Sequence, residues 1–180
     1  MNAKDEFGKT ALATACGTGS PRCIKMLVEA GSDINDRDMD GVVPLHEAIY
    51  RGNTDCLYEL IKYKPDSSIR QRSGKQPIDC VFIDNMHGTL KYILYDPDFL
   101  ALSNNDPNLS VTNENIERLM SQSIMYKAPE CQEILLKYQE EHKLSIEIDY
   151  SNLFARTLTV YNFTHWKEMK GTRINTEMLI

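Results

Sequence analysis

Long apolar runs, a basic excess and a secretory signal are all missing from this chain of 180 residues. No stretch approaches the roughly 18 uninterrupted apolar residues of a membrane-spanning helix, so no membrane insertion is expected. The first six residues contain no apolar run, which argues against a secretory signal there. Lys and Arg number 20 against 26 Asp and Glu, a net charge of −6. That balance argues against a dedicated nucleic-acid-binding protein.

The cysteines form neither a disulfide framework nor a zinc-binding pattern. They number five, and no two are spaced as Cys-x-x-Cys. We therefore expect reduced thiols in a cytoplasmic or nuclear protein. Cys80 is expected to be the more exposed of the set. The others fall beside apolar helix positions and are expected to be buried: Cys16, Cys23, Cys56 and Cys131.

Motifs that carry catalysis are also missing. The sequence has no His-Glu-x-x-His, no nucleophile elbow and no phosphate-binding loop. The Gly-rich residues 17–20 lack the Gly-Lys-Ser/Thr ending that a nucleotide cradle needs. No catalytic residue, metal site, cofactor or small-molecule substrate is therefore predicted.

What the chain does contain is an internal repeat of 33 residues. Five positions recur in three successive units: Gly8, Gly41 and Gly74; Leu12, Leu45 and Ile78; Ala15, Ala48 and Val81; Gly19, Gly52 and Asn85; Leu27, Leu60 and Ile93. Within each unit the apolar residues recur at i, i+3 and i+4, which predicts two short helices. Thr10 is the predicted N-cap of the first helix, and Pro44 and Pro77 stand at first helical positions.

These units resemble the ankyrin repeat family. Residues 38–48 read Asp-Met-Asp-Gly-Val-Val-Pro-Leu-His-Glu-Ala, which is similar to the family's Asp, Gly, Thr-Pro-Leu-His-x-Ala signature. The resemblance covers residues 3–96 and implies an all-α solenoid of stacked helix-turn-helix units with loop fingers. It also implies that His46 ties adjacent loops together by hydrogen bonds. The structural repeat residues it assigns are Gly8, Leu12, Gly41, Pro44, His46, Gly74 and Pro77.

The rest of the chain departs from the repeat. Turn residues predict a loop insertion over residues 97–112. Residues 113–143 form either a degenerate fourth repeat, with Cys131 on the position of Cys23 and Cys56, or an unrelated capping pair of helices. In the extension over residues 144–180, polar and apolar alternation predicts a strand near 144–150, and 158–163 is β-prone. The first unit is interpreted either as a cap or as the continuation of a longer repeat array.

The finger loops alternate in charge. Asp36, Asp38 and Asp40 precede the second unit, and Arg70, Arg72 and Lys75 surround the start of the third. Complementary charges steer partners and set their register, but ordinary solvated loops would also carry them. Asp38 is expected to shape its turn through side-chain to backbone hydrogen bonds.

The resemblance implies a non-catalytic protein-interaction module, an adaptor or scaffold that uses its loop tips and concave inner-helix face. The alternative is a cytoplasmic segment of a larger membrane protein, such as a transient receptor potential channel, that acts in assembly or gating. Tyr50 beside Arg51 is the preferred hot spot, because Tyr and Arg are enriched among such residues. The predicted partner-binding residues are Phe7, Lys9, Met39, Asp40, Val42, Tyr50, Arg51, Arg72, Lys75 and Asp84.

Overall fold

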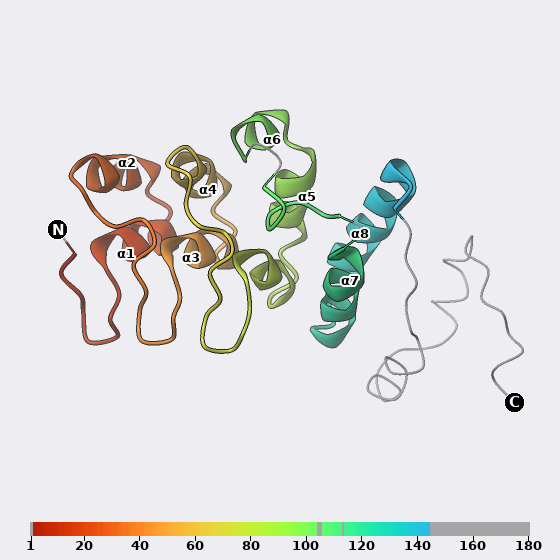
Figure 1. The fold of residues 1–180 in the computed structure, drawn as a ribbon, viewed down its shortest axis with the longest axis horizontal. Coiled ribbons are helices and arrows are strands. Elements are labelled where there is room, and N and C mark those ends of the chain that lie inside the picture. The colour runs from red at the N-terminus through yellow and green to blue at the C-terminus, as the bar shows by residue number, and fades with distance from the viewer. Residues whose placement is uncertain (1, 104–105, 113, 145–180) are drawn as a thin grey trace, which may run out of the picture. The chain divides into compact units, whose positions relative to one another are not determined.

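The computed structural model describes residues 2–103, 106–112 and 114–144 (Figure 1). The compact unit of residues 1–147 contains all of them and is considered by itself. Within these residues no strand forms, and one isolated β-bridge joins Lys4 to Thr10. The strands predicted near 144–150 and at 158–163 lie outside the described residues, apart from Leu144. No helix of the described residues is both long enough and apolar enough to cross a bilayer.

Helices follow one another in pairs along the chain, as the repeat predicts. The first unit contains α1 (Ala11–Thr18) and α2 (Pro21–Glu29), and the second contains α3 (Pro44–Tyr50) and α4 (Thr54–Ile61). The third contains the 3₁₀-helix η1 (Pro77–Phe82) and α5 (His87–Tyr95). They are followed by α6 (Pro97–Ser103), α7 (Ile116–Met125) and α8 (Pro129–His142). The all-α repeat fold predicted from the sequence is confirmed for the described residues.

Local signals set where the helices begin. The Thr10 hydroxyl accepts a hydrogen bond from the Ala13 backbone N–H at 3.2 Å, which confirms Thr10 as the N-cap of α1. Pro44 and Pro77 occupy first helical positions, where the missing N–H has no helical partner to lose. α1 ends at Gly19, whose φ of 79° is the left-handed conformation that glycine adopts most readily.

The helices stack in two rows with their connecting fingers on one side (Figure 1). In the inner row α1 packs on α3, and α3 packs on η1. In the outer row α2 packs on α4. The core lies between these rows, where Leu12, Leu45 and Ile78 are fully buried. The 33-residue period therefore places equivalent side chains in equivalent core layers.

Burial differs between equivalent positions of the first unit and later units. Cys56 and Cys131 are fully buried, whereas Cys23, at the equivalent position, is exposed. Leu27 is likewise half-buried, although its counterpart Leu60 is fully buried. Among the described residues, α2 packs on α1 and α4, and no earlier unit packs on it. The expectation that Cys23 is buried is therefore wrong, as is the expectation that Cys80 is more exposed, since only 2% of Cys80 is accessible.

The prediction of a loop over residues 97–112 is wrong at Pro97–Ser103, because these residues form α6. The Asp96 carboxylate accepts a hydrogen bond from the Phe99 backbone N–H at 2.9 Å, and Pro97 follows as the first helical residue. The same Asp-Pro pair that signals a turn thus also starts a helix. Phe99 is fully buried and packs against Tyr92 of α5, with ring centroids 5.4 Å apart. This burial favours the helix over a solvated loop.

Residues 116–142 occupy the place of a further repeat. α7 packs on η1 and on α8, and α8 packs on α5, as α3 and α4 pack on α1 and α2. Asn85, which stands where Gly19 and Gly52 do, has a φ of 51° and accepts a hydrogen bond from the Cys131 backbone N–H at 3.3 Å. Both sequence interpretations, a degenerate repeat and a capping pair, place two helices there.

Candidate functional site

In the first two fingers, the loops that lead into α1 and α3, an aspartate at the base orders the tip. The Asp5 carboxylate accepts hydrogen bonds from the backbone N–H groups of Phe7 and Lys9, at 3.0 and 2.8 Å. Asp38 repeats this arrangement one unit later, and accepts from Asp40 and Val42 at 2.9 and 2.8 Å. These bonds hold each tip in one conformation. Binding a partner therefore costs little loop entropy at the tips.

Adjacent fingers also bond to one another through their backbones. The Met39 N–H donates to the Phe7 carbonyl at 3.1 Å, and the Arg72 N–H donates to the Asp40 carbonyl at 2.7 Å. Gly41 has a φ of 75°, and a Cβ added there would come within 3.2 Å of the Arg72 nitrogen. Glycine therefore serves both the turn and the close approach of the next finger. Phe7, Met39, Asp40 and Arg72 become neighbours along one row of tips.

Two large apolar side chains lie exposed on this row. Phe7 is 62% accessible and Met39 is 58% accessible, although both belong to tightly hydrogen-bonded turns. Phe7 is therefore not part of the core. Asp40 and Arg72 beside them are also exposed. Among the ion pairs of the described residues, none includes the Arg72 side chain. The row thus combines apolar surface with charges of both signs.

A second group of predicted residues gathers around Glu47 of α3. The Lys9 ammonium lies 2.5 Å from one Glu47 carboxylate oxygen, and the Arg51 Nε lies 3.8 Å from the other. The Arg51 guanidinium carbon is 5.5 Å from the centre of the Tyr50 ring. Lys9 is thus already paired, whereas Arg51 remains exposed and Tyr50 half-buried. Tyr50 and Arg51 form a preorganised aromatic–cation pair at the end of α3.

His46 links the second finger to the third. Its Nδ1 accepts a hydrogen bond from the Val43 backbone N–H at 3.3 Å, and its Nε2 lies 3.2 Å from the Lys75 carbonyl, to which it donates in that tautomer. Burial lowers the pKa of His46 below its ordinary value, while the bond to Lys75 and the carboxylates of Asp79 and Asp38 oppose that shift. The residue therefore has the loop-linking geometry that the family resemblance implies.

The remaining predicted residues are dispersed. Val42 is half-buried behind its finger tip, and Asp84 is exposed past the end of η1. The Lys75 ammonium lies 4.7 Å from the centre of the Tyr126 ring, so this cation faces α7 and not the row of tips. Asp36 pairs with Lys4 at 2.6 Å. The alternating charges of the fingers are thus partly satisfied within the chain.

Sequence reasoning missed two residues that organise the surface. Glu47 joins Lys9 to Arg51, and the signal for it was the i, i+4 spacing of Glu47 and Arg51 on one helix. Arg118 of α7 pairs with the buried carboxylate of Asp79 in η1. No local pattern marks that pair, because its two residues stand in different units on either side of the insertion.

The thiols of the core are poor nucleophiles. Burial raises the pKa of Cys80 and of Cys131 to about 12, and it also raises the pKa of Cys16 and Cys56. The thiolate is the reactive form, so buried thiols with raised pKa values have little of it near neutral pH. The arrangement around the fingers offers recognition surface and fixed charges instead of an activated nucleophile.

Comparison with known proteins identifies the repeat. Residues 1–73 match the family model for ankyrin repeats in three copies. A chain segment of 112 residues is 30% identical to human (Homo sapiens) BCL-6 corepressor-like protein 1, covering 61% of this chain and 6% of that protein. Mouse (Mus musculus) protein phosphatase 1 regulatory subunit 27 is 35% identical over 95 residues, 53% of each chain.

A fission yeast relative extends over more of the chain. Ankyrin repeat-containing protein P1E11.10 of Schizosaccharomyces pombe is 31% identical over 127 residues, which is 69% of this chain and 59% of that protein. The chain therefore spans between 6% and 59% of the length of these three relatives.

Proposed function

We propose, from the premise that residues 1–73 belong to the ankyrin repeat family, that this chain is a non-catalytic module that binds another protein. The binding surface consists of the finger tips and the adjoining ends of the inner helices. The observation that carries the proposal is the exposure of Phe7 and Met39 on hydrogen-bonded fingers. Exposed apolar groups held in ordered turns are typical of interface anchors.

Charge and aromatic content support the same surface. Tyr50 and Arg51 lie together at the end of α3, and Tyr and Arg are the residue types that most often dominate binding energy. Arg51 is exposed and contacts Glu47 only at 3.8 Å, so it can pair with an acidic group of a partner. The chain's relatives include a protein named as a phosphatase regulatory subunit, which suits a regulatory or adaptor role. Five unpaired cysteines favour a reducing compartment, the cytoplasm or the nucleus.

The test is partner recovery by the Tyr50→Ala, Arg51→Ala double variant compared with wild type, in proximity labelling followed by titration calorimetry on the recovered protein. Loss of this pair is expected to weaken partner binding by about 1–3 kcal/mol. Because both side chains are at least partly exposed, the free energy of unfolding should change by less than about 1 kcal/mol.

A matched control carries two substitutions of an exposed pair on the outer helix, Lys25→Ala and Glu29→Ala. This control should recover partners as wild type does. Equal recovery by the Tyr50, Arg51 variant and wild type would contradict the proposed surface. Loss of cooperative unfolding in that variant would show that the pair is structural.

A further inference from the structure

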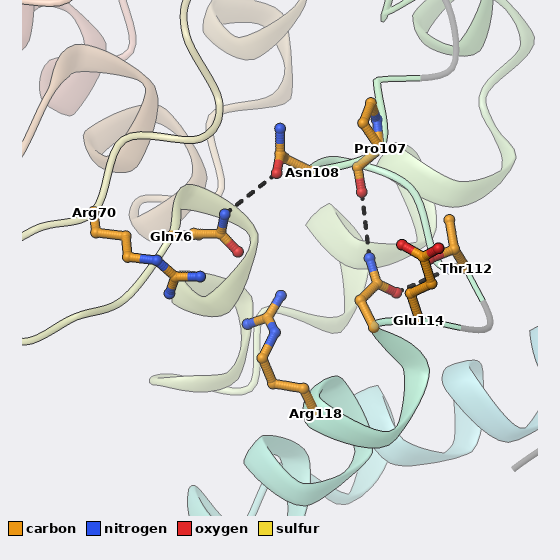
Figure 2. Close-up of a pocket in the computed structure, with 8 residues that line it drawn as sticks. Arg70, Gln76, Pro107, Asn108, Thr112, Glu114 and Arg118 are labelled. Atoms are coloured by element: carbon orange, nitrogen blue, oxygen red, sulfur yellow. Dashed lines mark hydrogen bonds between the residues drawn. The ribbon is translucent and has the colours of Figure 1, made fainter.

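A cleft lies between the third finger, the segment that follows α6, and the start of α7 (Figure 2). Its volume is about 570 Å³, which falls in the range of sites for small ligands and side chains. None of its lining residues belongs to the partner-binding set predicted from the sequence. They are Arg70, Gln76, Pro107, Asn108, Thr112, Glu114, Asn115 and Arg118.

Arg118 is fixed on one side of the cleft by a buried carboxylate. Its Nη1 donates to an oxygen of Asp79, whose side chain is 1% accessible. The other Asp79 oxygen accepts from the Gln76 backbone N–H at 2.9 Å. This hydrogen bond uses one of the five N–H donors of a guanidinium, and 31% of the Arg118 side chain remains accessible. Arg118 is therefore oriented by the fold with donors left over.

Arg70 supplies a second guanidinium from the third finger. Its Nη1 donates to the Gly74 carbonyl at 2.7 Å, which holds the side chain along its own loop. Within the described residues Arg70 forms no ion pair, so no carboxylate there neutralises it. Figure 2 shows the ends of Arg70, Gln76 and Arg118 turned toward the same space. Two like charges face one cleft in a chain whose net charge is −6.

The neutral walls of the cleft are already hydrogen-bonded. Gln76 donates from Nε2 to the Asn108 side-chain oxygen at 3.3 Å. Asn115 accepts from the Thr112 backbone N–H at 2.9 Å and donates to the Ser110 carbonyl at 2.8 Å. These amides therefore form a wall of the cleft, while the arginines supply N–H donors for a ligand. Planar guanidinium groups match the geometry of carboxylate and phosphate oxygens, which they bind in pairs of parallel hydrogen bonds.

We propose that this cleft binds a carboxylate or phosphate group on a peptide segment of a protein partner, with Arg70 and Arg118 as the donors. Glu114 lines the same cleft with an exposed carboxylate and repels such a group. The inference goes beyond the proposed function, because it assigns a second site with its own ligand chemistry.

The test titrates the full chain with three short peptides that share one Gly-rich sequence and differ at a central serine, glutamate or phosphoserine. Binding is followed through the Nε–Hε NMR signals of Arg70 and Arg118. Saturable shifts of both signals with the glutamate and the phosphoserine peptides would show that a carboxylate suffices. Shifts with the phosphoserine peptide alone would assign a phosphate. The serine peptide should leave both signals in place.

Three single variants separate the site from general charge. Arg70→Gln should weaken binding of the responding peptide about tenfold or more, because it removes a charge-assisted donor from the cleft. Arg72→Gln makes the same charge change on the same finger outside the cleft, and should stay within about twofold of wild type. Glu114→Gln should strengthen binding, because it removes the competing carboxylate. Arg118→Gln is avoided as the primary variant, since it would leave the buried Asp79 carboxylate unpaired.

Three outcomes would overturn the proposal. They are an absence of saturable shifts at both arginines, equal binding of the serine peptide, and equal losses in Arg70→Gln and Arg72→Gln. The Tyr50→Ala, Arg51→Ala variant should bind the peptides as wild type does. Failure of the finger-tip surface and failure of the cleft can therefore be told apart.

Discussion

At the scale of single residues, His46 shows how burial and hydrogen bonding act together. Both ring nitrogens have backbone partners, and the side chain is 1% accessible. Burial lowers the pKa of His46, so the folded chain favours the neutral ring more than the unfolded chain does. Below the unfolded value of about 6.5, the unfolded state then binds more protons than the folded state. Stability contributed by His46 is present above that pH and is lost as pH falls.

The resulting prediction concerns urea unfolding. Wild type should lose stability through His46 when pH falls from about 7.5 to about 5.5, because the unfolded chain takes up a proton there more readily than the folded chain does. In a His46→Gln variant the pH dependence over this range should shrink, although the variant itself is less stable at both values. If the variant kept the same pH dependence, His46 would have the same pKa in the folded and the unfolded chain, which would contradict the prediction.

At the scale of elements, the 33-residue period predicts which helix positions are buried and which are exposed. Leu60 of α4 is fully buried, as its period predicts, and Met26 of α2 is 61% accessible. Local signals account for where α1, α3 and η1 start, because caps and first-position prolines act within one turn. The start of α6 was not predicted from the sequence. Asp96 and Pro97 carry the same cap and first-position proline signals, but they lie in a segment that departs from the 33-residue period.

Leu60→Ala should destabilise the chain by about 2–5 kcal/mol, because it leaves a cavity between the helix rows. Met26→Ala removes a side chain of similar size from an exposed position and should cost less than about 1 kcal/mol. Both values come from denaturant unfolding followed by circular dichroism. A neutral Leu60→Ala would contradict the register assigned to the repeats.

At the scale of the whole described unit, ion pairs between side chains of adjacent units link one repeat to the next. Lys9 pairs with Glu47 between the first and second units, and Asp79 pairs with Arg118 between η1 and α7. In a linear stack each unit contacts only its neighbours, so such links decide how firmly a terminal unit is attached. Of the two carboxylates, Asp79 is the more deeply buried, with 1% of its side chain accessible against 10% for Glu47.

Arg118→Gln is expected to cost about 1–3 kcal/mol, because it leaves a buried carboxylate without its cation. Hydrogen exchange should show lost protection in α7 and α8 before it shows any in α1–α4. A double-mutant cycle with Asp79→Asn isolates the pair. Lys137→Gln, which breaks an exposed pair with Glu141, is the control and should stay within about 0.5 kcal/mol. Equal losses of unfolding free energy in Arg118→Gln and Lys137→Gln would contradict the prediction that the pair with the buried Asp79 carboxylate contributes more to stability.

The sequence by itself determined the repeat, the helix pairs, the cap at Thr10 and the all-α class, because these depend on contacts within a turn or at one fixed period. Tertiary structure decided what the period cannot encode. Cys23 is exposed and Cys56 is buried at the same repeat position, because only the second has a preceding unit against it among the described residues. The arginine cleft exists because the insertion and α7 bring Arg118 back to Asp79 across an interval that the repeat does not set.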